Sequence, residues 1–95
     1  MQAGYKIIEE DGVVGTSGTP KVIHSVTVWS GATGSVVNIY DGTSTSGTLV
    51  LSLTGTANIS VVFSLGGVGL VLKNGCYVDV DANIQSATVV YEEIL

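Results

Sequence analysis

The chain contains no arginine and only three lysines among its 95 residues, and eight aspartates and glutamates give it a formal net charge of −5. A protein that binds nucleic acid needs a basic surface to neutralise phosphates, and anchoring on anionic lipid makes the same demand. The shortage of positive charge therefore argues against nucleic acid and against a membrane surface as partners.

Cysteine is nearly absent too, because Cys76 is the only one. An intrachain disulfide is therefore impossible, and no set of cysteines and histidines is available for a structural metal site. A domain of this size buries only roughly 60–65% of its unfolded surface, so association with other chains is the remaining route to stability. A lone thiol stays reduced in a cytoplasm, which is where we expect the protein to be made.

Long hydrophobic runs are absent as well. Residues 59–72 form the most apolar stretch, and Gly66, Gly67 and Gly69 interrupt it. No run approaches the roughly 20 residues that a membrane-spanning helix needs. The N-terminus lacks a basic stretch followed by a long apolar core, so no secretory signal is predicted.

The chain is rich instead in valine, threonine, serine and glycine, which favour strands and turns over helices. Short apolar runs alternate with turn clusters at spacings of about 8–12 residues, which is typical of a sandwich or barrel. We predict one all-β domain over residues 1–95, a small β-sandwich or jelly-roll-like fold of about eight antiparallel strands. Asp11-Gly12, a hairpin-type turn signal, follows the first strand. The predicted strands are Tyr5–Glu10, Lys21–Trp29, Ser35–Tyr40, Thr48–Leu53, Ile59–Leu65, Leu70–Lys73, Tyr77–Val80 and Ala87–Glu92.

Strict alternation along a strand assigns side chains to its two faces. On this basis Trp29 lies on the opposite face of its strand from Val28, and Asp79 and Asp81 lie opposite Val78. The sets predicted to share a face are Val22, His24, Val26 and Val28; Leu49, Leu51 and Leu53; and Cys76, Val78 and Val80.

Two predicted strands, 35–40 and 59–65, carry apolar residues on both faces, since neighbouring valines occur in each. A strand that is apolar on both faces needs a second cover besides its own core. In so short a chain the simplest cover is another protein surface. The residues that we predict to lie in such an interface are Trp29, Val37, Tyr40 and Val62.

No catalytic centre is predicted. His24 is the only histidine, and no serine or threonine stands in a nucleophile elbow that would complement it. We expect His24 to be a hydrogen-bonded, partly buried strand residue. Cys76 alternates with valines, and the only cation near it in sequence is Lys73, three residues back across a turn. This apolar setting favours a core role over a reactive thiol. The sequence therefore predicts a protein that is not an enzyme.

No metal or cofactor site is predicted either. Asp79 and Asp81 share a strand face, but the spaced aspartates and distal glutamate of a calcium loop are missing. The glycine-rich segment 66–69 is not followed by the lysine and helix of a nucleotide site. The acidic clusters Glu9-Glu10-Asp11 and Glu92-Glu93 provide solubility and protect strand edges, or they dock on a basic partner.

The aromatic residues leave one binding alternative open. Trp29 and Tyr40 end successive predicted strands and would lie near each other if those strands were neighbours. A pair of exposed aromatic rings is the usual platform on which sugars stack. A small carbohydrate-binding domain is therefore an alternative function.

The segment Val36–Thr48, with its central Tyr40-Asp41-Gly42, resembles a phrase found in small virion proteins of tailed bacteriophages, especially marine ones. The Asn-Gly-x-Tyr-Val segment at 74–78 and the final strand 87–92 extend the resemblance, which covers residues 23–92. It implies a small β-sandwich on the particle, a capsid decoration (cement) or knob protein made in the host cytoplasm.

The resemblance also implies partners. They would be the major capsid protein or other virion proteins, with the chain itself a homo-oligomer, a trimer being favoured. A tail- or fibre-associated module is the alternative within the virion. The resemblance brings no catalytic or binding residues with it.

Overall fold

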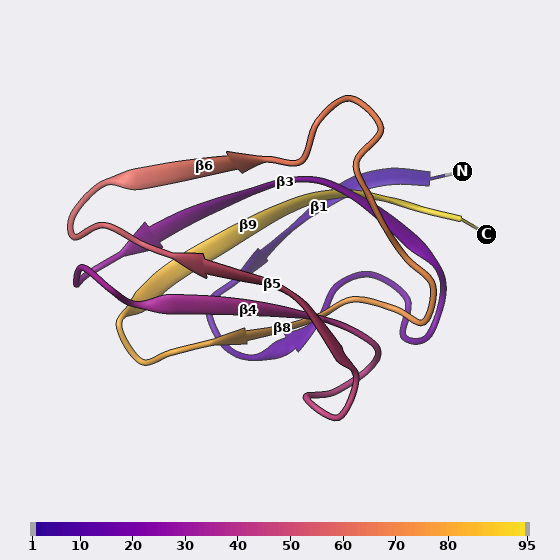
Figure 1. Cartoon of the computed structure of the whole chain (residues 1–95), viewed down its shortest axis with the longest axis horizontal. Coiled ribbons are helices and arrows are strands. Elements are labelled where there is room, and N and C mark those ends of the chain that lie inside the picture. The colour runs from indigo at the N-terminus through magenta and orange to yellow at the C-terminus, as the bar shows by residue number, and fades with distance from the viewer. Residues whose placement is uncertain (1, 95) are drawn as a thin grey trace.

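The computed structural model describes residues 2–94, and the side chains of residues 4–94. Every regular element in this part of the chain is a strand (Figure 1). No helix among these residues is therefore long and apolar enough to span a membrane. The strands are β1 (Gln2–Ile8), β2 (Gly12–Val13), β3 (Lys21–Ser30), β4 (Val36–Asp41), β5 (Thr48–Thr54), β6 (Ser60–Ser64), β7 (Leu70–Leu72), β8 (Tyr77–Val80) and β9 (Ile84–Glu93).

The strands form two antiparallel sheets. Sheet A has the order β1-β9-β3-β6, with β7 pairing with another stretch of β3, and sheet B has the order β2-β8-β4-β5. Most successive strands change sheet, and this strand order is that of a jelly roll. The predicted all-β, jelly-roll-like sandwich is therefore confirmed.

All eight predicted strands are present, with ends that differ by a few residues. The ninth strand, β2, has only two residues and was not predicted. Asp11-Gly12 does not close a hairpin, because β1 lies in sheet A and pairs with β9, whereas β2 lies in sheet B and pairs with β8. The turn instead carries the chain from one sheet to the other.

The core lies between the sheets and consists mainly of valine and isoleucine, whose branched side chains pack well on a pleated surface. Cys76, Val78 and Val80 face it together, as alternation predicts. The core residues with no exposed surface on the four central strands are Ile23, Val26 and Val28 on β3, Val37 and Ile39 on β4, Val78 on β8, and Ala87 and Val89 on β9.

Two β-bulges correct the other predicted faces. His24 is an extra residue in β3, since Ile23 pairs with Tyr91 and Ser25 pairs with Val90. A bulge shifts the alternation by one, so Ile23 faces the core and Val22 faces outward, on the opposite side from Val26 and Val28. In β5 the register shifts by one residue at Val50. Leu51 and Leu53 therefore face inward, whereas Leu49 is exposed.

Val37 was predicted to lie in a protein interface, and this prediction is wrong. Its side chain has no exposed surface, because it pairs with Leu53 and points between the sheets. The outward residue of this pair of valines is Val36, which is half-buried. The interface prediction therefore retains Trp29, Tyr40 and Val62 as surface residues.

Candidate functional site

The outer face of sheet A gathers most of the exposed apolar side chains of the molecule. It is defined here by the side chains of its five strands that point away from sheet B. Among residues 4–94, ten large apolar side chains are exposed, and six of them lie on this face. These six are Tyr5 and Ile7 on β1, Trp29 on β3, Val62 on β6, Val71 on β7 and Val90 on β9.

Between these apolar residues stand hydroxyl side chains, in rows that cross the sheet. Ile7 pairs with Thr88, Thr88 with Thr27, and Thr27 with Val62. The neighbouring row starts at Tyr5 and likewise runs over Val90 to serines on β3 and β6. Neither row contains a charged residue, so this part of the surface is apolar and uncharged.

His24 and Glu92 are the only histidine and acidic side chains that the strands of sheet A present on this face. His24 Nε2 lies 3.0 Å from Glu92 Oε1, and their side chains are 31% and 32% exposed. The bulge in β3 positions the imidazole, and Glu92 stands beside it on β9. No hydroxyl of the described residues is hydrogen-bonded to the imidazole, so the pair lacks the nucleophile of a catalytic triad.

The adjacent residue, Glu93, points the other way, into the end of the sandwich. Lys21, with no exposed surface, donates from Nζ to the carbonyl oxygens of Thr16 at 2.5 Å and Thr19 at 2.9 Å, and lies 3.4 Å from Glu93 Oε1. The backbone N–H of Thr16 donates to the same carboxylate. That hydrogen bond, followed by those from the side chains of Lys21 and Thr16, holds the pKa of Glu93 below its usual value. Glu92-Glu93 is therefore not a single acidic docking cluster.

The outer face of sheet B differs in character. Tyr40 pairs directly with Tyr77, and Asn38 pairs with Asp79. Burial, together with the negative charge of nearby Asp11, raises the pKa of Asp79. Tyr40 thus lies on the opposite side of the sandwich from Trp29, and the predicted stacking platform of these two rings is wrong.

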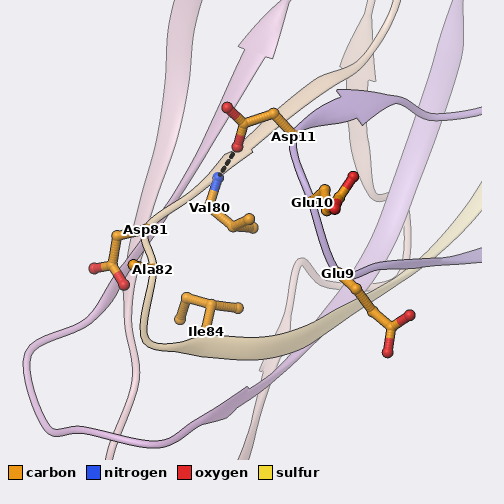
Figure 2. Close-up of a pocket in the computed structure, with 7 residues that line it drawn as sticks. All are labelled: Glu9, Glu10, Asp11, Val80, Asp81, Ala82 and Ile84. Carbon is orange, nitrogen blue, oxygen red and sulfur yellow. Dashed lines mark hydrogen bonds between the residues drawn. The ribbon is translucent and has the colours of Figure 1, made fainter.

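An acidic pocket lies at the side of the sandwich where β1 passes to β2. Asp11 Oδ1 accepts a hydrogen bond from the N–H of Val80 at 2.8 Å, and Asp81 Oδ2 accepts one from the N–H of Val36 at 2.7 Å. Figure 2 shows the carboxylates of Glu9, Asp11 and Asp81 pointing in different directions. Within residues 2–94 no group of three potential metal ligands converges. The carboxylates of Asp11 and Asp81 instead accept hydrogen bonds from backbone N–H groups.

Cys76 lies in the core with no exposed surface, as predicted. Burial raises the pKa of its thiol to about 12, although the positive charge of Lys21 opposes the shift. A thiol with so high a pKa is protonated at neutral pH and is a poor nucleophile. Cys76 therefore serves as a small core residue.

Sequence reasoning found Trp29 and Val62 but missed most of the face that they belong to. Tyr5 and Ile7 alternate on β1, and Thr88 and Val90 alternate on β9. This alternation was visible in the sequence. What the sequence did not indicate is that β1, β9 and β3 are neighbours, which is what turns separate residues into one surface.

Comparisons with known proteins add no further constraint: no family model matches the chain, and neither a curated protein nor a solved structure matches it. The outer face of sheet A is therefore the main functional candidate among the described residues. Its apolar and hydroxyl groups suit binding to another protein surface.

Proposed function

We propose that the chain is a non-enzymatic structural protein of a tailed-phage virion, a capsid decoration (cement) protein that binds the assembled head. The observation that carries this proposal is the apolar, nearly uncharged outer face of sheet A. The resemblance of residues 23–92 to small phage virion proteins is the reason for proposing a phage particle as the assembly that it binds. The surface of the major capsid protein is the proposed partner.

The outer face has the dimensions of a docking surface. Four strands about 4.8 Å apart and about eight residues long cover roughly 500 Å² in projection, a large part of the roughly 800 Å² on one side of a standard interface. Trp29, at 50% exposure, and Tyr5, at 69%, are the kind of aromatic side chain that anchors such contacts. Many copies bound on one shell would multiply a modest affinity by valency.

The alternative functions differ in which residues they need on one face and in where the protein would lie on the particle. Jelly rolls occur in viral coats and in lectins alike, so the fold decides nothing between them. The carbohydrate-binding alternative depended on Trp29 and Tyr40, and their placement on opposite faces removes its basis. A tail- or fibre-associated module would use the same outer face, and only its location on the particle distinguishes it from a head protein.

The test is co-sedimentation of the purified chain with DNA-filled heads that lack it, and separately with isolated tails and with unassembled capsid subunits. We expect binding to heads. Ile7→Lys, which places a charge on the outer face, should weaken that binding at least about tenfold, since desolvating a charge in an apolar contact is costly.

Leu49→Lys is the matched control, because Leu49 is also 51% exposed but lies on sheet B. It should bind heads like the unmodified chain. Binding to tails alone would replace the head assignment by the tail alternative. Equal binding by both variants would mean that the outer face of sheet A is not the docking surface, and binding to neither particle would refute the virion role.

A further inference from the structure

The free edge of β6 is the least protected strand edge in the described part of the chain. Strand edges are normally guarded by charge, by short length or by a bulge. Among the other edges, β1 carries Lys6, β2 and β7 are only two and three residues long, and β5 contains the bulge at Val50. β6, with the sequence Ser-Val-Val-Phe-Ser, has none of these features and pairs with β3 in unbroken register. Figure 1 shows it at the border of the molecule.

The chain segment on this side of the molecule carries no charge. Residues 42–72, which include β5, β6 and β7, contain no Asp, Glu, Lys, Arg or His, although the chain as a whole has a net charge of −5. Two copies therefore repel each other least when they approach with this side. A partner that recognised charge would find nothing to bind here, whereas a second uncharged edge fits.

We propose that a second copy of this chain docks on β6, with the two β6 strands antiparallel about a two-fold axis at Val62. Ser60 of each copy then stands opposite Ser64 of the other, and Val62, which is 65% exposed, meets its own copy. The half-buried, inward-facing Val61 and Phe63 gain cover at the rim of the core. The unpaired backbone groups of both edges are satisfied by strand addition.

Two further exposed apolar residues fit this arrangement. Ile59, 53% exposed, immediately precedes β6, and Val68, 83% exposed, lies in the loop that follows it. An antiparallel pairing about Val62 brings the segment before β6 in one copy beside the segment after β6 in the other. The dimer thus brings together, near the two-fold axis, apolar side chains that are exposed to solvent in the single chain.

The pairing predicts a dimer and not the trimer implied by the phage resemblance, because a strand that pairs with its own copy closes after two. A five-residue contact is small, so we expect a weak dimer with a dissociation constant in the micromolar to millimolar range. It joins two sheets A into one and doubles the outer face. The dimer itself does not depend on the proposed function. Only the significance of the doubled outer face rests on it, because that face is the surface proposed to dock on the phage shell.

The experiment is sedimentation equilibrium on the free chain from micromolar to millimolar concentration. We expect a monomer–dimer equilibrium. Ser60→Lys/Ser64→Lys, both at exposed positions, sets lysine against lysine and should weaken the dimer at least about tenfold. Thr43→Lys/Thr45→Lys adds the same charge in an exposed loop and should leave the dimer unchanged.

The second part of the experiment mixes two variants of opposite charge. Ser60→Glu/Ser64→Glu should also fail to dimerise alone, but mixed with the lysine variant it should form a heterodimer, because each lysine then faces a glutamate. A monomer at every concentration, a trimer, undiminished dimerisation of the lysine variant, or no heterodimer on mixing would each overturn the proposal. This experiment contains no phage particle, so it tests the dimer independently of the proposed function. A chain that dimerises here but fails to bind heads in the co-sedimentation test refutes only the virion role.

Discussion

Glu92 and Glu93 are neighbours on β9, yet they belong to different regions of the molecule. Glu93 turns into the end of the sandwich and meets the fully buried Lys21, whereas Glu92 turns outward and meets His24, whose side chain is about one-third exposed. The distances are similar, 3.4 Å and 3.0 Å, but the surroundings are not. A buried ion pair leaves an uncompensated charge when one partner is lost, while water readily replaces a surface partner. The inner pair, Lys21 and Glu93, should therefore govern stability, and the outer pair, His24 and Glu92, should not.

Replacing Lys21 should have the largest effect. Lys21→Met keeps most of the volume but removes the cation that faces the carboxylate of Glu93 and the ammonium that donates to the carbonyls of Thr16 and Thr19. We expect a loss of about 3–5 kcal/mol in the free energy of unfolding, measured by urea denaturation. Lys73→Met removes the same charge from an exposed position and should change it by less than about 0.5 kcal/mol. Equal effects would show that burial does not distinguish these lysines.

Gly15 allows the loop before β3 to close over the inner pair. Its φ is +68°, and an added Cβ would lie 2.9 Å from Lys21 Cε and in collision with the Glu93 carboxylate. Gly15→Ala should therefore cost about 2–3 kcal/mol of stability. Gly18→Ala is the matched control, because its φ of +78° is similar but nothing lies within 4 Å of the added atom. It should cost only about 1 kcal/mol, and equal losses in thermal unfolding would show that the inner pair tolerates intrusion.

Acid should weaken the inner pair. The pKa of Glu93 is lowered in the folded state by the Thr16 N–H and by Lys21, so the unfolded chain binds this proton more tightly. The stabilisation is then complete above the unfolded value of about 4.3 and is lost as pH falls through the folded value. The difference in unfolding free energy between the unmodified chain and Glu93→Gln should be largest at pH 7 and should shrink below about pH 4. A difference that stays constant to pH 3 would contradict this linkage.

Local sequence patterns determine which features of the fold could be predicted: the positions of the strands, but not every face. Valine-rich runs and glycine turns located eight of the nine strands, because propensity and turn chemistry act locally. The faces were correct along β8, where alternation is unbroken, and wrong where the bulges at His24 and Val50 shift it. A bulge depends on how two strands pair, so the sequence of one strand does not reveal it.

The candidate site was predicted less completely for the same reason. Trp29 and Val62 were recognised one by one as surface residues, but their union with Tyr5 and Val90 depends on strand order. Val37 was misplaced because adjacent valines do not show which of the two faces inward. The Glu92-Glu93 pair looked like a single acidic cluster, although successive residues of a strand point to opposite faces.

The outer pair supplies the smallest expected effect. Glu92→Gln keeps the shape of the side chain and can still accept a hydrogen bond from His24, so the free energy of unfolding should change by less than about 1 kcal/mol. Any change should diminish further as salt is added, because both side chains are about one-third exposed and their interaction is screened. The measurement is urea denaturation at low and high ionic strength, alongside Lys21→Met. A loss that approaches that of Lys21→Met and persists in high salt would mean that the outer face of sheet A contributes to stability in addition to its proposed role in binding. A hydrated, screened pair of side chains could not produce so large a loss.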